Sequence, residues 1–225
     1  MALGEYEVDK DGQIIRALRS IEKQAKGFKA PSVTLVSRSS GPYQVLVSCI
    51  LSLRTKDKTT IEASERLFKV ASSPRSMIKL PLKRLEKIIY PVGFYRNKAK
   101  VISGLSRRII SEFRGRVPDK IDELLSLKGV GRKTANLVLG LGFGIPAICV
   151  DTHVHRIANR LGWVKTNGPE ETEKELAKIF PKRLWIGLNT TLVAFGQNLC
   201  GPVSPFCSAC AVAGLCRKAG VKRPR

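Results

Sequence analysis

Four cysteines in the last 26 residues of the sequence constrain its fold more than any other feature. Cys200, Cys207, Cys210 and Cys216 are separated by six, two and five residues. Thiolates crowded onto so short a segment repel one another unless a cation or a cluster holds them, so the spacing predicts a four-thiolate metal site. A tetrahedral zinc ion and a [4Fe-4S] cluster both satisfy this pattern, and the spacing alone does not separate them.

The charge of the chain restricts its partners. Among its 225 residues, 40 Lys and Arg stand against 18 Asp and Glu, a formal net charge of +22. Such an excess favours a polyanion, either nucleic acid or an anionic membrane surface. The longest apolar run, residues 137–150, is interrupted by three glycines and Pro146, and it is shorter than the roughly 18 residues of a membrane span. We therefore expect a soluble protein that binds nucleic acid and not a membrane.

The start of the sequence bears on the compartment. Its first 13 positions carry four acidic residues and no apolar stretch, unlike a secretory signal. We therefore expect a reducing compartment, in which Cys49 and Cys149, each in apolar surroundings, are buried thiols without chemistry.

The spacing of apolar residues predicts the fold class. They recur at helical intervals along most of the chain, as at Ile14, Leu18 and Ile21. Prolines and glycines interrupt the pattern often enough to give about ten helices. The chain is therefore expected to be all-α.

Residues 127–135 read Leu-Lys-Gly-Val-Gly-Arg-Lys-Thr-Ala. Two glycines around one valine let the backbone turn tightly and bring N–H groups up to an anion without a Cβ in the way. An ordinary helix–loop–helix corner with glycine caps gives the same pattern. On a chain this basic, the expected anion is a DNA phosphate, and the expected contacts are Gly129, Val130, Gly131 and Arg132.

This hairpin, the segment Val150-Asp151-Thr152-His153 and the four cysteines occur in an order that resembles the endonuclease III family of helix-hairpin-helix DNA glycosylases. The resemblance covers roughly residues 30–217. It implies a two-lobed fold with a helical barrel domain at 32–145, which contains the helix-hairpin-helix at about 121–142. Residues 1–31 and 146–225 then form a discontinuous domain, in which the four cysteines hold a [4Fe-4S] cluster and not zinc.

The resemblance also implies an activity. The family suggests a bifunctional DNA glycosylase and AP lyase of base excision repair, which removes oxidised pyrimidines from duplex DNA and cleaves 3′ to the abasic site by β-elimination. Lys133 matches the position of the attacking amine. Burial, the neighbouring Arg132 or the start of the helix would lower the pKa of this amine. The resemblance also makes Asp151 the second catalytic residue, expected across the cleft between the lobes, and its place before a helix makes it a good N-cap.

Three further residues are expected to contact DNA. Phe94 is in the wedge position, where an aromatic ring can replace an extruded base, although core packing would also suit this residue. Arg54 stands where many members of the family have glutamine, so the preference for the opposite base does not carry over. His153 is expected near the site. Residues 201–206 carry no basic side chain, so phosphate contacts in this region fall to the last residues of the sequence.

Two rival functions remain at this point. One is a mismatch glycosylase on the same fold, acting on uracil or thymine opposite guanine. The other is a DNA-binding iron-sulfur protein without catalysis. In each case the expected partner is double-stranded DNA. For the two enzymes, this DNA contains damaged bases or abasic sites. The resemblance suggests a monomer in the cytoplasm of a prokaryote, associated with the nucleoid.

Overall fold

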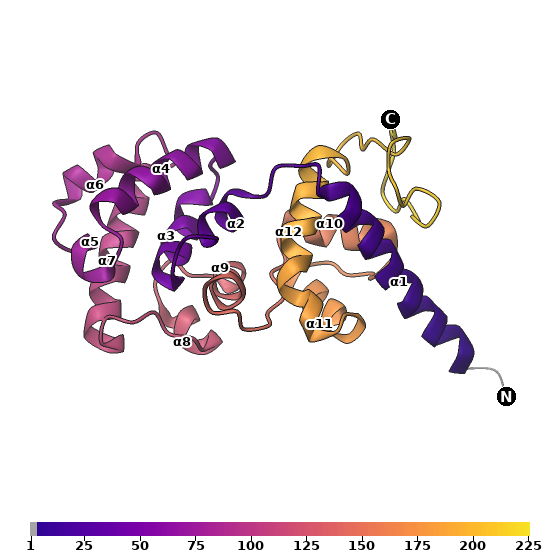
Figure 1. Cartoon of the computed structure of the whole chain (residues 1–225), viewed down its shortest axis with the longest axis horizontal. Coiled ribbons are helices and arrows are strands. Elements are labelled where there is room, and N and C mark those ends of the chain that lie inside the picture. The colour runs from indigo at the N-terminus through magenta and orange to yellow at the C-terminus, as the bar shows by residue number, and fades with distance from the viewer. Residues whose placement is uncertain (1–3) are drawn as a thin grey trace. The chain divides into compact units, whose positions relative to one another are not determined.

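The structure, a computed structural model, describes the backbone of residues 4–225 and the side chains of residues 12–225 (Figure 1). Within this range every regular element is helical, which confirms the all-α class. None of these helices has the length and apolarity of a membrane span. In chain order the elements are α1 (Gly4–Ala25), α2 (Ser32–Ser37), α3 (Pro42–Ser52), α4 (Asp57–Val70), α5 (Pro74–Met77), α6 (Leu82–Ile89), α7 (Tyr95–Phe113), α8 (Ile121–Ser126), α9 (Arg132–Leu137), the π-helix η1 (Val138–Gly142), α10 (Thr152–Leu161), α11 (Pro169–Ile179) and α12 (Lys182–Asn198).

The chain divides into two compact units. One, which we call the hairpin unit, comprises residues 31–147, and the other, the cysteine unit, comprises residues 1–30 and 148–225. The expected domain bounds, 32 and 145, differ from the observed 31 and 147 by one and two residues. Lys133 therefore belongs to the hairpin unit, and Asp151 with the four cysteines belongs to the cysteine unit.

Helix α3 is the central element of the hairpin unit. It is apolar on nearly every side, so it is buried around its circumference. Val45, Leu46, Val47, Ile50 and Leu51 are at most 2% exposed. The helix contacts α2, α4, α7, α9 and η1. It therefore supports the start of α9, which carries Lys133, as well as the loop that follows its own C-terminal end.

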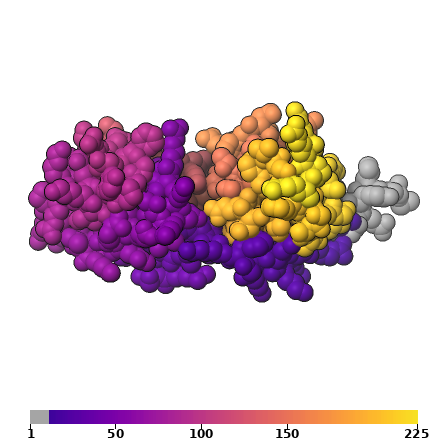
Figure 2. Space-filling model, turned by 90° about the horizontal axis from the view of Figure 1, so that it is seen from above, coloured from indigo at the N-terminus to yellow at the C-terminus, as the bar shows by residue number. Residues whose placement is uncertain are grey.

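The cysteine unit is built on the contacts of α12 with α1 and α10. Its core contains apolar residues from all four helices of the unit, among them Leu18, Ile21, Ile157, Leu176, Leu192 and Phe195. The segment after α12 is irregular and packs on this core through Cys200, Cys210 and Cys216. Figure 2 shows this segment, in yellow, on the surface of the unit. Gln24 of α1 helps to hold it, donating to the carbonyl of Ala209 at 2.6 Å.

Candidate catalytic and DNA-binding site

The hairpin tip joins α8 to α9. The N–H group of Val130 donates to the carbonyl of Leu127 at 3.0 Å, and both side chains are buried. Gly129 has φ +89°, and a Cβ there would lie 2.7 Å from Cγ1 of Val101. Gly131 has φ −95° and open space around it. The fold thus requires glycine at 129 but tolerates a side chain at 131, and Val130 uses its N–H group within the turn.

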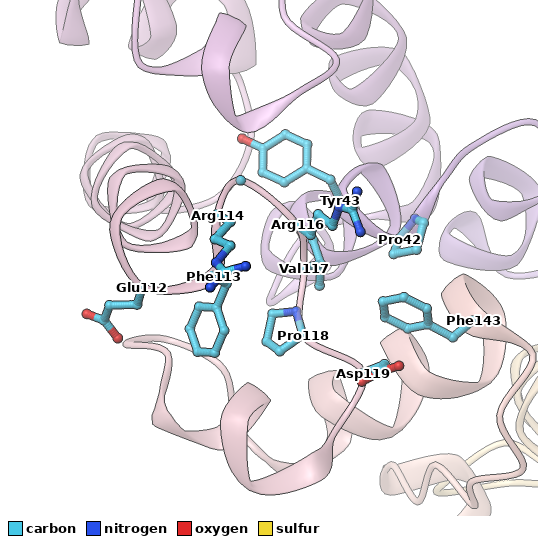
Figure 3. Close-up of a pocket in the computed structure, with 11 residues that line it drawn as sticks. Pro42, Tyr43, Glu112, Phe113, Arg114, Arg116, Val117, Pro118, Asp119 and Phe143 are labelled. Carbon is cyan, nitrogen blue, oxygen red and sulfur yellow. The ribbon is translucent and has the colours of Figure 1, made fainter.

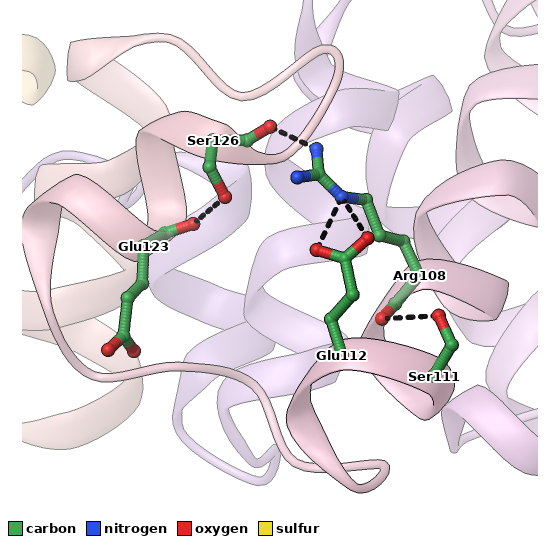
Figure 4. Close-up of polar contacts among 5 residues, drawn as sticks. All are labelled: Arg108, Ser111, Glu112, Glu123 and Ser126. Atoms are coloured by element: carbon green, nitrogen blue, oxygen red, sulfur yellow. Dashed lines mark hydrogen bonds and ion pairs between the residues drawn. The ribbon is translucent and has the colours of Figure 1, made fainter.

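Arg108 ties α7 to the end of α8, just before the hairpin tip (Figure 4). Its Nε donates to both carboxylate oxygens of Glu112, at 2.7 and 2.8 Å, and its Nη1 donates to the carbonyl of Ser126. This contact fixes the end of α8 against α7. The sequence does not indicate the contact of Arg108 with α8. Arg and Glu four residues apart on a helix usually form a solvated pair that contributes little to stability.

Lys133 lies in the first turn of α9, beside Arg132, and its side chain is exposed. It also lies close to α3. Burial raises the pKa of the Cys49 thiol to about 12, and the positive charge of Lys133 partly opposes that rise. The structure therefore does not bury Lys133 within the protein, although burial was one of the expectations for this residue. An exposed amine at this position is accessible to a substrate.

Arg54 and Phe94 lie side by side, although they are far apart in the sequence. The guanidinium carbon of Arg54 is 5.8 Å from the centre of the Phe94 ring. Both residues have a left-handed backbone conformation, with φ +52° and +56°. This conformation costs a residue other than glycine about 1–2 kcal/mol. Both side chains are exposed, that of Phe94 to 64%. This exposure rules out core packing as the role of Phe94, and two strained, exposed neighbours are typical of a functional position.

Asp151 caps α10, as the sequence predicts. Its Oδ1 accepts hydrogen bonds from the N–H groups of His153 and Val154, both at 2.9 Å. The charge of the carboxylate also acts on Arg156: burial lowers the pKa of this guanidinium, and Asp151 partly opposes the effect. The cap therefore orients the carboxylate whether or not it takes part in catalysis. Lys133 belongs to the other unit, and the joint action of the two residues stays a prediction.

His153 is partly buried and is held by contacts within the cysteine unit. Its Nδ1 accepts a hydrogen bond from Nη2 of Arg156 at 3.1 Å. The imidazole packs against Gly196 of α12, where a Cβ would lie only 2.6 Å from Nδ1. These contacts give His153 a structural role, and its contact with DNA stays a prediction.

Two substitutions separate the capping role of Asp151 from its predicted catalytic role. Asp151→Asn keeps an oxygen that accepts the two N–H groups but removes the charge, so we expect nearly unchanged stability and base excision slower by about 10²-fold or more. Asp151→Ala should show the same loss of activity and lose a further 1 kcal/mol or so of unfolding free energy. Single-turnover excision and urea denaturation measure the two effects. Full activity of Asp151→Asn would leave Asp151 as a cap alone.

The four cysteines line a single pocket of the cysteine unit. Burial raises the pKa of Cys210, and the charges of Cys200, Cys207 and Cys216 raise it further, so the sulfurs are near one another. The backbone N–H of Lys218 donates to Sγ of Cys216 at 3.3 Å. Within residues 12–225, no group of three or more His, Cys, Asp or Glu side chains is arranged so that it could hold a metal ion. The donors at this pocket are four thiols, one of which accepts from the backbone N–H of Lys218, and such a donor set fits an anionic iron-sulfur cluster.

Two arginines of α10 fix the loop after Cys200. Arg160 is 6% exposed and donates to the carbonyls of Gly201 and Pro202 at 2.6 and 2.5 Å. Its Nη1 also donates to Sγ of Cys200 at 3.5 Å. Arg156 donates to the carbonyl of Cys200 at 2.7 Å. A buried guanidinium needs hydrogen-bond acceptors nearby, and the carbonyls of Gly201 and Pro202 supply them for Arg160.

Basic charge reaches this loop from the end of the sequence. The guanidinium of Arg225 lies 3.9 Å above the ring of Phe206 and donates to the carbonyl of Ser204 at 2.9 Å. The hydroxyl of Ser204 donates to the carbonyl of Arg223 at 3.0 Å. The end of the sequence therefore packs on the segment that has no basic side chain of its own, and the phosphate contacts expected in this region stay a prediction.

A pocket of about 610 Å³ in the hairpin unit lies apart from these residues (Figure 3). It is lined by the start of α3, the end of α7 and the segment up to Asp119, with Phe143 at its edge. Arg114 and Arg116 share it with Glu112 and Asp119, so their charges are balanced. None of the expected site residues lines it.

Comparison with known proteins identifies the class. Residues 47–182 match the family model of the HhH-GPD superfamily, described as base excision DNA repair proteins. Endonuclease III of Thermotoga maritima is 48% identical over 179 residues, which span 80% of this chain and 84% of that protein. The chain therefore belongs to the HhH-GPD superfamily, and within it to the endonuclease III family.

Solved structures agree with this assignment. A trapped endonuclease III–DNA covalent intermediate, an estranged-adenine complex, superposes with a TM-score of 0.83 at 38% identity. The match covers 92% of this chain and 96% of that one. A thermostable thymine-DNA glycosylase gives a TM-score of 0.82 at 24% identity over 93% of this chain and 96% of that one. At this lower identity the second likeness shows the fold alone.

Proposed function

We propose that this protein removes oxidised pyrimidines from duplex DNA and cleaves the strand 3′ to the resulting abasic site, with Lys133 as the nucleophile and Asp151 as the second catalytic residue. As a member of the endonuclease III family, it is a DNA glycosylase and AP lyase of base excision repair that binds DNA. The lysine at the hairpin is the observation that carries the proposal, because it supplies an exposed amine beside a turn that can approach a phosphate backbone.

The chemistry requires a neutral amine. Nζ of Lys133 attacks C1′ of an extruded nucleoside, and the bond from C1′ to the base breaks, with the base leaving as it takes up a proton. Opening of the sugar gives a Schiff base between C1′ and Nζ. Loss of a C2′ proton then expels the 3′ phosphate by β-elimination, and water releases the amine. The charge of Asp151 stabilises the positive character that develops at C1′ as the base departs.

The covalent DNA complex of a relative supports this route, since it shows that an endonuclease III can be trapped on DNA. The neighbouring Arg54 and Phe94 supply the other requirement. A flipped nucleotide leaves a gap in the stack, and an aromatic ring with a guanidinium beside it can fill that gap and contact the unpaired base. We assign both residues to this role, and the hairpin glycines with Arg132 to the phosphate contacts.

Cys200, Cys207, Cys210 and Cys216 would hold a [4Fe-4S] cluster. Such a cluster would fix the irregular segment after α12, which packs on the core through three of these cysteines. We assign it no step of the reaction. We further propose that the protein acts as a monomer.

Lesion preference tests the proposal against its rivals. In single-turnover assays, we expect duplexes with an oxidised pyrimidine to be processed about 10²-fold faster than those with uracil or thymine opposite guanine. Each excised strand should also be nicked 3′ to the abasic site. Faster mismatch processing without nicking would favour the mismatch glycosylase. Binding with neither excision nor nicking of abasic duplexes would favour a non-catalytic protein.

A further inference from the structure

Lys98 is a buried lysine of α7 whose ammonium group donates hydrogen bonds to the end of α3 and the loop that follows it. The residue is 5% exposed, and Nζ donates to the carbonyls of Leu51 and Leu53, at 2.8 and 2.5 Å, and to Oγ1 of Thr55 at 3.1 Å. An ammonium group has three N–H donors, so these acceptors use all of them. They lie on both sides of Arg54. The loop that presents Arg54 is therefore fixed by a single side chain from another helix.

The same contacts cap the C-terminal end of α3. The last carbonyls of a helix have no partner within it, and a cation there interacts favourably with the helix dipole. Burial lowers the pKa of Lys98 to about 8. An apolar side chain at this depth would avoid that cost but would leave the carbonyls of Leu51 and Leu53 without their donor. The presence of a lysine at this buried position is thus explained by the hydrogen bonds that it donates to the loop and not by core packing.

The loop that contains Phe94 is also bonded to Thr55. Oγ1 of Thr55, which accepts from Lys98, also accepts from the N–H group of Gly93 at 3.2 Å. A Cβ on Gly93 would lie 2.6 Å from the carbonyl oxygen of Arg54, so only glycine allows the two loops to approach this closely. Lys98 is itself in the first turn of the helix that Phe94 caps.

From this geometry we propose that Lys98 is a positioning residue for DNA opening: it holds Arg54 beside Phe94, so that the pair can fill the gap left by an extruded nucleotide. The inference rests on the proposed function, which gives the pair its role. It adds a residue that touches neither the DNA nor the reacting atoms. Lys98 would then matter only where a base stack has to be opened and filled.

Duplex and single-stranded substrates separate this role from a general structural one. Lys98→Met keeps the apolar stem and removes all three donors. The matched control is Lys100→Met, which removes an exposed lysine two residues along the same helix. Each variant is assayed for nicking of an abasic site in duplex DNA and in single-stranded DNA, where no duplex has to be opened. Lys98→Met should lose about 10- to 100-fold in kcat/KM on the duplex, while its single-strand rate and the control stay within about threefold of the parent.

A double-mutant cycle with Phe94→Ala gives a second readout. If Lys98 acts through the pair, the double variant should lose little more on duplex DNA than the more damaged single variant. Equal losses of Lys98→Met on both substrates, no loss on either, or fully multiplicative losses in the cycle would each overturn the proposal. A parent protein that fails to nick either substrate would contradict the proposed function itself, so the two failures are distinct.

Discussion

Lys133→Gln is expected to abolish covalent trapping of the protein on abasic DNA by borohydride and to reduce strand nicking by on the order of 10³-fold or more. The amide cannot form the Schiff base that borohydride reduces. Because Lys133 is exposed at the start of a helix, the substitution should leave unfolding in urea within about 0.5 kcal/mol of the parent.

Lys128→Gln is the matched control for this prediction. Lys128 is an exposed lysine at the same hairpin, so its loss removes one positive charge without removing the nucleophile. We expect weaker DNA binding with a smaller salt dependence, and unimpaired trapping at saturating DNA. Trapping that persists in Lys133→Gln and disappears in Lys128→Gln would identify Lys128, and not Lys133, as the nucleophile.

Cys207→Ser is expected to remove the iron and sulfide of the purified protein, about four of each per chain in the parent. Without the cluster the irregular segment loses its cross-link, and a loss of about 3 kcal/mol would lower Tm by roughly 10 °C. Elemental analysis and thermal unfolding measure both effects. One zinc ion per chain in the parent, with no sulfide, would contradict the cluster.

Cys149→Ser provides the comparison within the same unit. Cys149 is 3% exposed and lies outside the four-cysteine pocket, so its substitution should leave the iron content unchanged. We expect about 1–2 kcal/mol of destabilisation from placing a hydroxyl in apolar surroundings. A fall in iron content in this variant would show that metal loss follows from instability and not from a missing ligand.

The predictions that succeeded depend on local sequence patterns. Helical spacing of apolar residues is enough to give the all-α class, and the capping role of Asp151 follows from its place before a helix. Helices α2 and α5, of six and four residues, are too short to show an apolar period, so the twelve α-helices in residues 4–225 exceed the ten or so expected. Likewise, nothing in the sequence indicates that α9 continues as a π-helix.

Contacts between distant segments were beyond prediction. Arg54 and Phe94 were each expected to contact DNA, but only the fold shows that they are neighbours with strained backbones. Lys98 reads in the sequence as one more surface lysine on a basic chain. Arg160, which holds the loop after Cys200, is equally inconspicuous. Each depends on an acceptor at least 40 residues away, which no periodic pattern encodes.

Peptide mapping of the borohydride-reduced complex tests the central claim most directly. After nuclease and protease digestion, tandem mass spectrometry locates the residue that carries the reduced sugar. The account predicts a single adduct on Nζ of Lys133. An adduct on any other amine of the chain, or a parent protein that forms none with abasic DNA, would contradict it.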